Sequence, residues 1–230
     1  MPATGRRFQK AALGVAFFVF VVMLMPLPSQ ATPAQDQALI AAAERGDSPA
    51  VEKLLREGAD LAARDDKGRS ALLAATHGNQ VEAARLLIAA GADVNAKDSI
   101  GDSPFLYAGA EGRNEILKMT LAAGADLAST NRYGGTALIP AAHHGHVETV
   151  QILLTTAIDK DHVNSLGWTA LLEAVILGDG GPAHRAIVRA LVDAGANVNL
   201  ADGDGVRPLA LARRRGFADI GRMLETAGGR

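Results

Sequence analysis

Apolar positions along this chain recur in pairs of short helical segments. The first segment of a pair is built largely from small residues, and the second carries larger apolar side chains on one face. Residues 147–154 show the second kind, because their apolar side chains return at the spacing of a helix that is buried on one side. Polar, glycine-containing turns separate the segments. The pattern predicts helix pairs joined by turns over most of the chain.

Two glycine registers show that the pairs repeat at a fixed distance. The first register comprises Gly68, Gly101, Gly134, Gly167 and Gly205. Its first four members lie 33 residues apart, and the fifth follows after 38. The second register comprises Gly58, Gly91, Gly124 and Gly195, with Ala157 where a further glycine is expected. Repetition at this period is typical of small units stacked in a row and seldom of a single globular core.

Each glycine of the first register lies between a turn and the start of a helix. An Asp or Asn opens the turn, and the glycine supplies a backbone angle that other residues resist. The residues expected to cap the following helices are Ser70, Ser103, Thr136 and Thr169. Pro104 and Pro208 suit the first position of a helix. Pro140 falls near a helix start, where its ring would remove one early hydrogen bond; it either marks a local distortion or is tolerated in the first turn.

These motifs resemble the ankyrin repeat. The turn blocks, such as Asn-Ser-Leu-Gly-Trp-Thr-Ala-Leu at 164–171, are similar to the family's TPLH-type turn, and Gly-Ala-Asp-Val-Asn at 91–95 is similar to its unit ending. The resemblance covers roughly residues 32–228. It implies an all-α solenoid of about six helix-turn-helix units with β-turn fingers. The expected units are residues 32–64, 65–97, 98–130, 131–163, 164–201 and 202–230.

Several positions depart from the family pattern. The histidine of the TPLH-type motif is absent, and its places hold Leu73, Leu106, Ile139, Leu172 and Ala210. The first unit lacks the turn motif, which indicates a capping unit at that end of the stack. Its core side chains are expected to be Leu39, Val51, Leu54 and Leu55. The last unit has Arg207 at the capping position and is expected to close the other end.

Residues 1–31 do not fit the repeat. Arg6, Arg7 and Lys10 precede an uninterrupted apolar run at 11–25, which is followed by prolines and a Ser-Gln-Ala sequence. This arrangement is typical of a secretory signal peptide. The run is shorter than the about 20 residues that a membrane-spanning helix needs. We therefore expect a periplasmic or secreted protein; the alternative is an uncleaved segment that anchors the chain in the inner membrane.

Charge and composition narrow the function classes. Without residues 1–31 the chain has 20 basic and 25 acidic residues, a net charge of −5. That balance argues against nucleic acid as a partner, because phosphate binding needs a basic surface. The chain has no cysteine, so stability must come from packing between repeats and not from disulfides. No cofactor and no small-molecule substrate are expected.

Two clusters could carry chemistry. They are His143, His144 and His146, and Asp159, Asp161 and His162. The first could ligate a metal and the second could serve acid–base catalysis, which defines an alternative function as a metal-dependent or hydrolytic enzyme. Adjacent residues on a helix diverge, however, and no further ligand completes the histidine set at a suitable spacing. We interpret both clusters as structural features of the repeats.

The glycine-rich segment 178–182 is the remaining irregularity. It lacks the Lys-Ser/Thr pair of a phosphate-binding loop. The spacing from Gly178 to Gly195 is five residues longer than in other units, which indicates an insertion between the two helices of one unit. Insertions in repeat proteins often map to the binding face, so the segment is either functional or simple structural drift.

The ankyrin resemblance implies that finger tips and first helices line a concave binding face. The residues expected to bind a protein partner there are Asp66, Lys67, Arg69, Ile100, Asp102, Arg132, Tyr133, His143, His144, Leu166, Trp168, Ile176 and Leu177. The early tips are charged and the later ones are apolar. Exposed aromatic and aliphatic side chains are typical of interaction sites. The sequence therefore predicts an exported adaptor that binds a protein of unknown identity and is not an enzyme.

Overall fold

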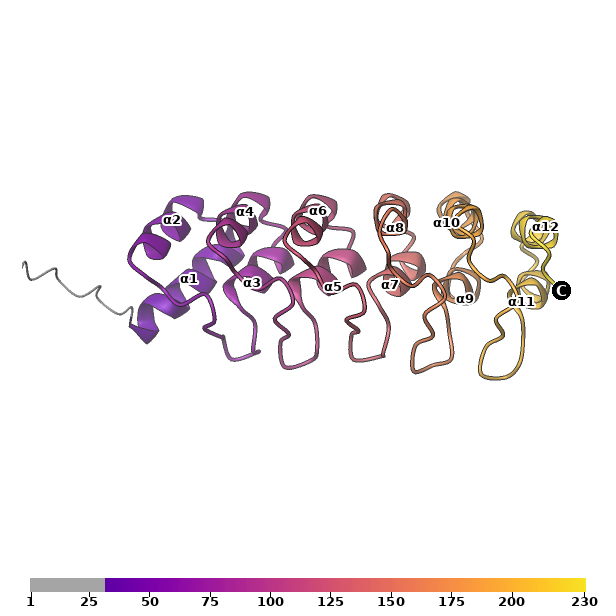
Figure 1. Cartoon of the computed structure of the whole chain (residues 1–230), viewed down its shortest axis with the longest axis horizontal. Helices are drawn as coiled ribbons and strands as arrows, with labels where there is room; N and C mark the ends of the chain where they lie inside the picture. The colour runs from indigo at the N-terminus through magenta and orange to yellow at the C-terminus, as the bar shows by residue number, and fades with distance from the viewer. Residues whose placement is uncertain (1–31) are drawn as a thin grey trace, which may run out of the picture.

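The computed structural model describes residues 32–230 as six helix pairs stacked in a row (Figure 1). The helices are α1 (Pro33–Arg45), α2 (Ser48–Arg56), α3 (Ala71–His77), α4 (Val81–Ala89), α5 (Pro104–Ala110), α6 (Asn114–Ala122), α7 (Leu138–His143), α8 (Val147–Leu154), α9 (Ala170–Ile176), α10 (Pro182–Asp193), α11 (Pro208–Arg214) and α12 (Ala218–Thr226). No strand occurs among these residues. The expected signal peptide lies outside the described residues. The all-α solenoid that the sequence predicted is confirmed.

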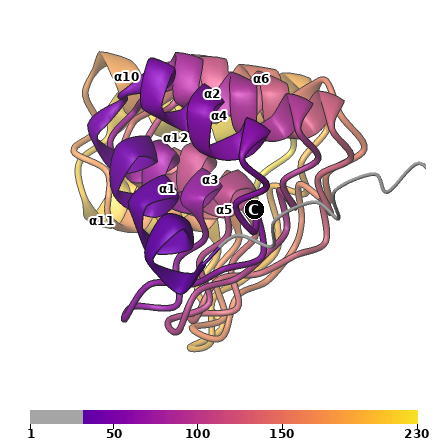
Figure 2. The same cartoon turned by 90° about the vertical axis from the view of Figure 1, so that its left-hand side faces the viewer.

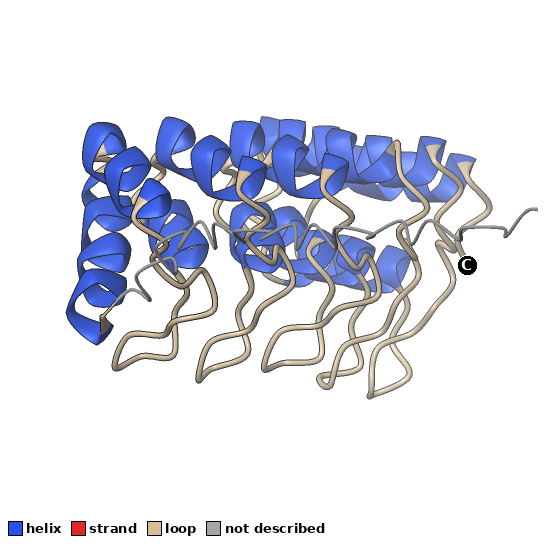
Figure 3. Ribbon diagram, turned by 60° about the vertical axis from the view of Figure 1, so that its left-hand side comes forward, coloured by secondary structure: helices blue, strands red, loops and turns tan. Residues whose placement is uncertain are grey.

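Two layers of helices run along the stack. The odd-numbered helices form an inner layer and the even-numbered helices an outer layer, and each helix contacts its pair partner and its counterparts in adjacent pairs. The even-numbered helices lie on one side of the stack, and the long fingers between pairs project on the opposite side, beyond the odd-numbered helices (Figures 2 and 3). The core is therefore a continuous seam between the layers.

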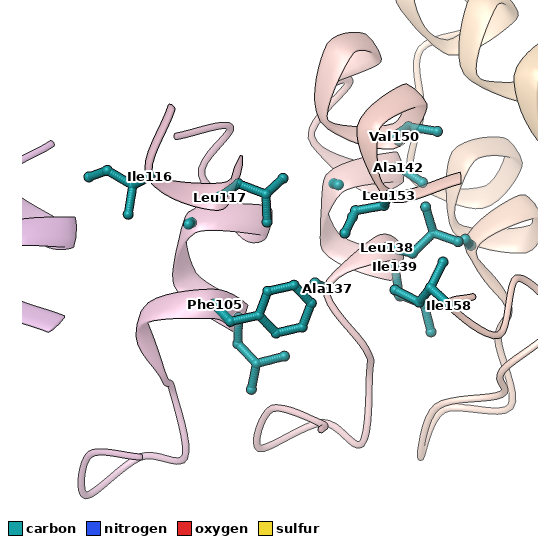
Figure 4. Close-up of a cluster of buried hydrophobic side chains, with 14 of the residues drawn as sticks. Phe105, Ile116, Leu117, Ala137, Leu138, Ile139, Ala142, Val150, Leu153 and Ile158 are labelled. Atoms are coloured by element: carbon teal, nitrogen blue, oxygen red, sulfur yellow. The ribbon is translucent and has the colours of Figure 1, made fainter. Parts of the chain in front are cut away.

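Small side chains let the inner helices approach one another closely. A Cβ atom on Gly109 of α5 would lie 2.8 Å from the Cβ of Ala137, which real structures do not allow. Larger apolar side chains then fill the space between the layers, with Phe105, Leu138 and Leu153 all fully buried (Figure 4). The small-residue pattern of the first helices thus sets the spacing between units.

The first unit closes its end of the stack as expected. Leu39 and Val51 are fully buried, while Leu54 and Leu55 are partly buried against the same core. Thr32 caps α1 through a capping box with Gln35, which satisfies backbone donors at the start of the helix. No unit precedes α1 within residues 32–230. This helix is longer than the other inner helices and forms the end of the inner layer.

Each finger is closed by the Asp or Asn that opens it. In the third finger the Asn131 Oδ1 accepts hydrogen bonds from the backbone N–H groups of Tyr133 (2.9 Å) and Gly135 (3.0 Å). The same pair of bonds recurs at Asp65, Asp98, Asn164 and Asp202. The side chain of the first residue therefore closes the finger, and the side chains at the tip are free to vary.

Neighbouring fingers also touch through their backbones. Ser99 N–H donates to the Lys67 carbonyl at 3.1 Å, and Ser165 N–H donates to the Tyr133 carbonyl at 2.9 Å. Gly68 has a φ of 78° and lies so close to the next finger that a Cβ there would come within 2.8 Å of the Ser99 nitrogen. Glycine at this register therefore serves both the turn and the contact between fingers.

Three of the four expected helix caps are confirmed. The hydroxyls of Ser70, Ser103 and Thr169 each accept a hydrogen bond from a backbone N–H three residues later, at 3.2 Å. The prediction for Thr136 is wrong, because its buried hydroxyl has no hydrogen-bond partner and α7 begins one residue later than in the other units.

Pro140 explains the failed cap. In other units the residue four positions after the cap donates its N–H to the cap carbonyl, as Glu173 does to Thr169 at 2.9 Å. Pro140 has no N–H, so the Ile139 N–H donates to the Thr136 carbonyl instead, at 3.2 Å. The Ile139 donor is then unavailable to the Thr136 hydroxyl. Of the two alternatives that the sequence left open at this proline, the structure shows the local distortion.

The unit without a second-register glycine ends its outer helix differently. Ala157 does not adopt the left-handed backbone of its glycine counterparts. Instead the hydroxyls of Thr155 and Thr156 donate to the carbonyls of Ile152 (2.7 Å) and Leu153 (2.6 Å), which satisfies the last turn of α8.

Removal of the hydroxyl at Thr169 and at Thr136 should distinguish a hydroxyl that caps a helix from one that has no hydrogen-bond partner. Thr169→Val should lower the free energy of unfolding by about 1 kcal/mol, because it removes a cap hydrogen bond. Thr136→Val removes a buried hydroxyl that has no partner and should be neutral or stabilising. Urea unfolding of both variants measures the difference. Equal losses at both positions would contradict this interpretation.

Candidate functional site: a groove between fingers and inner helices

A groove of about 490 Å³ lies between the fingers and the ends of the inner helices in the middle of the stack. Its lining includes eight of the residues that the sequence indicated: Ile100, Asp102, Arg132, Tyr133, His143, His144, Leu166 and Leu177. It also includes Tyr107, Asn164 and Glu173, which the sequence did not indicate as binding residues. The groove draws on α3, α5, α7, α9 and the intervening fingers, so that no single unit forms it.

Exposed apolar side chains form a row along the finger side of the groove. Ile100, Tyr133 and Leu166 occupy the same position in three successive fingers, directly before the turn glycine, and are 51–53% exposed. Leu177, at the end of α9, is 42% exposed and extends the row to the inner helices. We call these four residues the apolar row. Large apolar side chains this exposed and this regularly spaced are typical of a binding surface.

Charged and aromatic groups surround the apolar row. The Arg132 guanidinium lies 4.9 Å from the centroid of the Tyr133 ring and 3.4 Å from an Asp102 carboxylate oxygen. Burial raises the pKa of Asp102 above its usual value. At the other end of the groove the rings of His77 and Tyr107 stack, with centroids 3.7 Å apart, and burial lowers the pKa of His77.

Glu173 is the buried carboxyl group of the groove. It is only 6% exposed, and its Oε1 accepts a hydrogen bond of 2.9 Å from the Asn164 Nδ2. The nearest nitrogen to its Oε2 in an ion-pair geometry is the His143 Nδ1, at 3.8 Å. Burial raises the pKa of Glu173 to about 7, and this effect outweighs the Asn164 hydrogen bond, which lowers the pKa. A comparison of the repeat registers would have revealed this residue, since no other unit has an acid at that position.

The histidine cluster serves the packing between units. The His144 Nδ1 lies 2.8 Å from the Ala110 carbonyl at the end of α5, and the His146 ring packs where Gly112 leaves space. Burial lowers the pKa values of His143 and His146. Within residues 32–230 no group of three or more His, Asp or Glu side chains is placed to hold a metal ion.

The second candidate cluster is likewise part of the repeat framework. The Asp159 Oδ1 accepts from the Asp161 N–H at 3.0 Å, and the Asp161 Oδ1 accepts from the Asn197 N–H of the next unit at 2.8 Å. The His162 Nε2 lies 2.7 Å from the Gly134 carbonyl. These contacts join neighbouring fingers and turns, and they favour the structural interpretation over acid–base catalysis.

The expected exposure of Arg69 at a finger tip is wrong. Arg69 is 7% exposed, with its guanidinium 2.7 Å from Asp65 and 2.8 Å from Glu44 of the first unit. Its hydrogen bond to Glu44 lowers the pKa of that carboxyl. The Arg69 side chain folds back toward the first unit instead of pointing away from the finger. It is therefore held between a carboxylate of its own unit and one of the first unit.

The other predicted binding residues lie outside the groove lining. Asp66 and Lys67 are exposed on the first finger, and Trp168 and Ile176 are partly buried. Trp168 contributes its N–H to the Asn164 turn, at 3.0 Å. Tyr133 and Leu166 therefore lie at the centre of the exposed apolar surface, and Trp168, which the sequence also indicated, lies outside the groove lining.

The inserted segment is packed between units. The His184 Nε2 lies 2.9 Å from the His143 carbonyl, and its Nδ1 lies 2.8 Å from Asp179. Arg215 of the last unit donates to the Gly178 carbonyl at 2.9 Å. The outer helix that follows, α10, has 12 residues, compared with 8 in α8. Apart from Leu177 at its edge, the segment does not line the groove.

Comparisons with known proteins agree with this architecture. A family model for ankyrin repeats (three copies) matches residues 20–98, 38–131 and 105–202, which together span most of the chain. The chain belongs to the ankyrin-repeat family. Members of this family are typically interaction modules that bind proteins and are not enzymes, so the chain is a protein–protein interaction module.

Individual relatives support the assignment. An ankyrin repeat domain from Acinetobacter baumannii AYE is 55% identical, with a TM-score of 0.82 over 84% of this chain and 98% of that domain. The ankyrin repeat protein EF0377 is 41% identical, with a TM-score of 0.79 over 82% and 96%. The ankyrin repeat domain of Bcl-3, a member of the IkappaB protein family, is 30% identical, with a TM-score of 0.76 over 84% and 86%.

A further similarity is confined to a short stretch. The ankyrin repeat protein YahD of Escherichia coli (strain K12) is 48% identical over 56 residues. The match covers 24% of this chain and only 28% of YahD. None of the helices in residues 32–230 has the length and apolar character required to traverse a bilayer.

Replacement of Glu173 tests whether its burial is costly to the fold. The carboxyl ionises at a pKa of about 7 in the folded chain and near 4.5 when unfolded. Between these values the folded state binds more protons, so the contribution to stability falls as pH rises from about 4.5 to 7. Glu173→Gln retains an acceptor for Asn164 and should exceed the parent in unfolding free energy by about 1–3 kcal/mol at pH 8.

The advantage of Glu173→Gln should shrink toward zero at pH 5, where the folded parent is protonated. Urea unfolding at the two pH values measures it. Glu148→Gln, at an exposed position on α8, is the matched control and should show no comparable pH dependence. A difference that is the same at both pH values would show that ionisation of Glu173 is not its cause.

Proposed function

We propose that this protein is an exported adaptor that binds a segment of a partner protein in the groove. The observation that carries the proposal is the apolar row, in which three successive fingers present Ile100, Tyr133 and Leu166 beside the groove. Each finger is closed by the side chain of its opening Asp or Asn, and this closure holds the three side chains in a regular series. A partner segment that lies along the stack would bury them together.

The chemistry of the groove also fits a polypeptide partner. Apolar side chains alternate with polar groups such as Asn131, Arg132 and His144, which can hydrogen-bond to a main chain or to side chains. The Arg132–Asp102 ion pair at the edge can guide the approach of a charged partner. The enzyme alternative has no comparable support, since both candidate clusters form contacts within the repeat framework.

Export is the second part of the proposal, and it rests on the sequence of residues 1–31. A basic start, an apolar run and small residues before position 32 support a cleaved signal peptide. Thr32 caps α1, so cleavage after residue 31 would leave the described fold intact. The partner would then be a periplasmic or extracellular protein.

Mass spectrometry of the protein recovered from a bacterial envelope fraction tests export. We expect a chain that begins at or near Thr32 and is released with the soluble periplasmic contents. A full-length mass in the membrane fraction would favour the alternative, in which the N-terminal segment is retained as an anchor.

Truncation of the apolar row tests the groove. A Tyr133→Ala/Leu166→Ala double variant should retain its fold, because both side chains are about half exposed. Its capture of partner protein from an envelope extract should fall roughly tenfold or more, as expected for the loss of two anchors. Quantitative mass spectrometry of the captured proteins measures the effect.

Val163→Ala provides the control for this experiment. Val163 is also about half exposed but does not line the groove. Its replacement should leave capture unchanged. The groove would be excluded as the binding site if the double variant captured the same proteins in the same amounts as the parent.

A further inference from the structure

Glu173 is not required by the repeat that contains it. The equivalent positions in the other units with a finger hold Ala74, Tyr107, Pro140 and Leu211. All these units close their fingers through the oxygen of the opening Asp or Asn, without help from that position. The bond from Asn164 to Glu173 is therefore an addition to the common framework, made in the unit that contributes Leu166 and Leu177 to the apolar row.

The Glu173 carboxyl also has no permanent counter-charge within the described residues. Asn164 contributes a neutral amide, and His143, whose pKa is lowered by burial, stays 3.8 Å away. The charge of protonated His144 lowers the pKa of Glu173, but that ring contacts the Ala110 carbonyl. The nearby cation of the groove, Arg132, is paired with Asp102. A buried carboxylate without a cation is unfavourable, and a cation supplied from outside the chain would relieve that cost.

The surroundings of Glu173 fit a long basic side chain. The residue is 94% buried yet lines the groove, and Tyr133, Leu166 and Leu177 line the same groove. The apolar stem of an arginine or lysine could pack against such a lining while its charged end reaches the carboxylate. Arginine fits best, because its planar guanidinium pairs with carboxylates through two parallel hydrogen bonds and stacks on rings such as His143.

We propose that the partner segment inserts a basic side chain, preferably arginine, onto Glu173 while its neighbouring apolar residues pack on Tyr133 and Leu166. This inference rests on the proposed function and specifies the partner's chemistry. Asn164 positions the carboxylate, and the apolar row excludes water around the pair. The energetic cost of keeping Glu173 in the fold is consistent with a group retained for binding.

Selection from a random peptide library tests the inference without knowledge of the natural partner. A library of displayed peptides is selected on the purified protein at pH 8, where Glu173 is ionised. Peptides whose binding is lost with Tyr133→Ala are classed as groove binders. They should be enriched in arginine or lysine next to apolar residues, and Glu173→Gln should weaken them at least tenfold.

Matched changes on both sides locate the contact. Replacement of the peptide's basic residue by glutamine should cause a loss similar to that from Glu173→Gln, and the two losses should not add. Glu148→Gln, which removes the same charge from an exposed position outside the groove, should change affinity by less than twofold. Thermal unfolding confirms that each variant is folded.

The possible results separate the two proposals. Groove binders that lack basic residues, or that bind Glu173→Gln as well as the parent, would overturn the inference and leave the proposed function standing. A selection in which no peptide depends on Tyr133 would overturn the proposed function and the inference with it. If Glu148→Gln weakened the binding of basic peptides as much as Glu173→Gln, the effect would be a general one of charge. That result would also overturn the inference.

Discussion

The structure depends on one constraint, which is that no helix pair can bury its apolar face alone. Each pair contacts only its neighbours, and the seam between the two layers is continuous from α1 to α12. Close approach requires small residues in the inner helices, as the contact between Gly109 and Ala137 shows. The spacing between units follows from this packing, and so does the spacing between fingers. A surface on the fingers therefore inherits a period that the core determines.

The hydrogen bonds that close the fingers do not involve the side chains that form the proposed binding surface. The opening Asp or Asn and the turn glycine hold each finger, and hydrogen bonds such as Ser99 to Lys67 join one finger to the next. The side chain just before the glycine has no part in this framework. It is Ile100, Tyr133 and Leu166 in three successive fingers. Variation at that position can therefore alter the surface of the groove while the hydrogen bonds of the fingers stay the same.

Several departures from the repeat lie at the groove. Pro140 displaces the start of α7, and Glu173 occupies a position that is apolar or aromatic in the other finger-bearing units. His77, stacked on Tyr107, has a buried Nε2 without a hydrogen-bond partner. Features that do not serve stability are expected where a binding site requires them. Their location beside the apolar row supports the proposal that the groove is the binding site.

The sequence by itself determined the architecture, because helix periodicity, turn glycines and helix caps are local and recur in every unit. That Tyr133, Leu166 and Leu177 would share one face was implied by the resemblance to the ankyrin repeat and not by the local pattern. Contacts between units could not be inferred in this way. Burial of Arg69 depends on Glu44 of the preceding unit, and the role of His144 depends on a carbonyl of α5.

Only the tertiary structure decided which of the chemically suggestive residues were free to act. It placed Asp161 and His162 in hydrogen bonds between units and brought Glu173 beside the apolar row. The physical reason is that exposure and pKa depend on everything packed around a side chain. Those neighbours come from adjacent units, 25 to 36 residues away in the chain, where a local pattern carries no information about them.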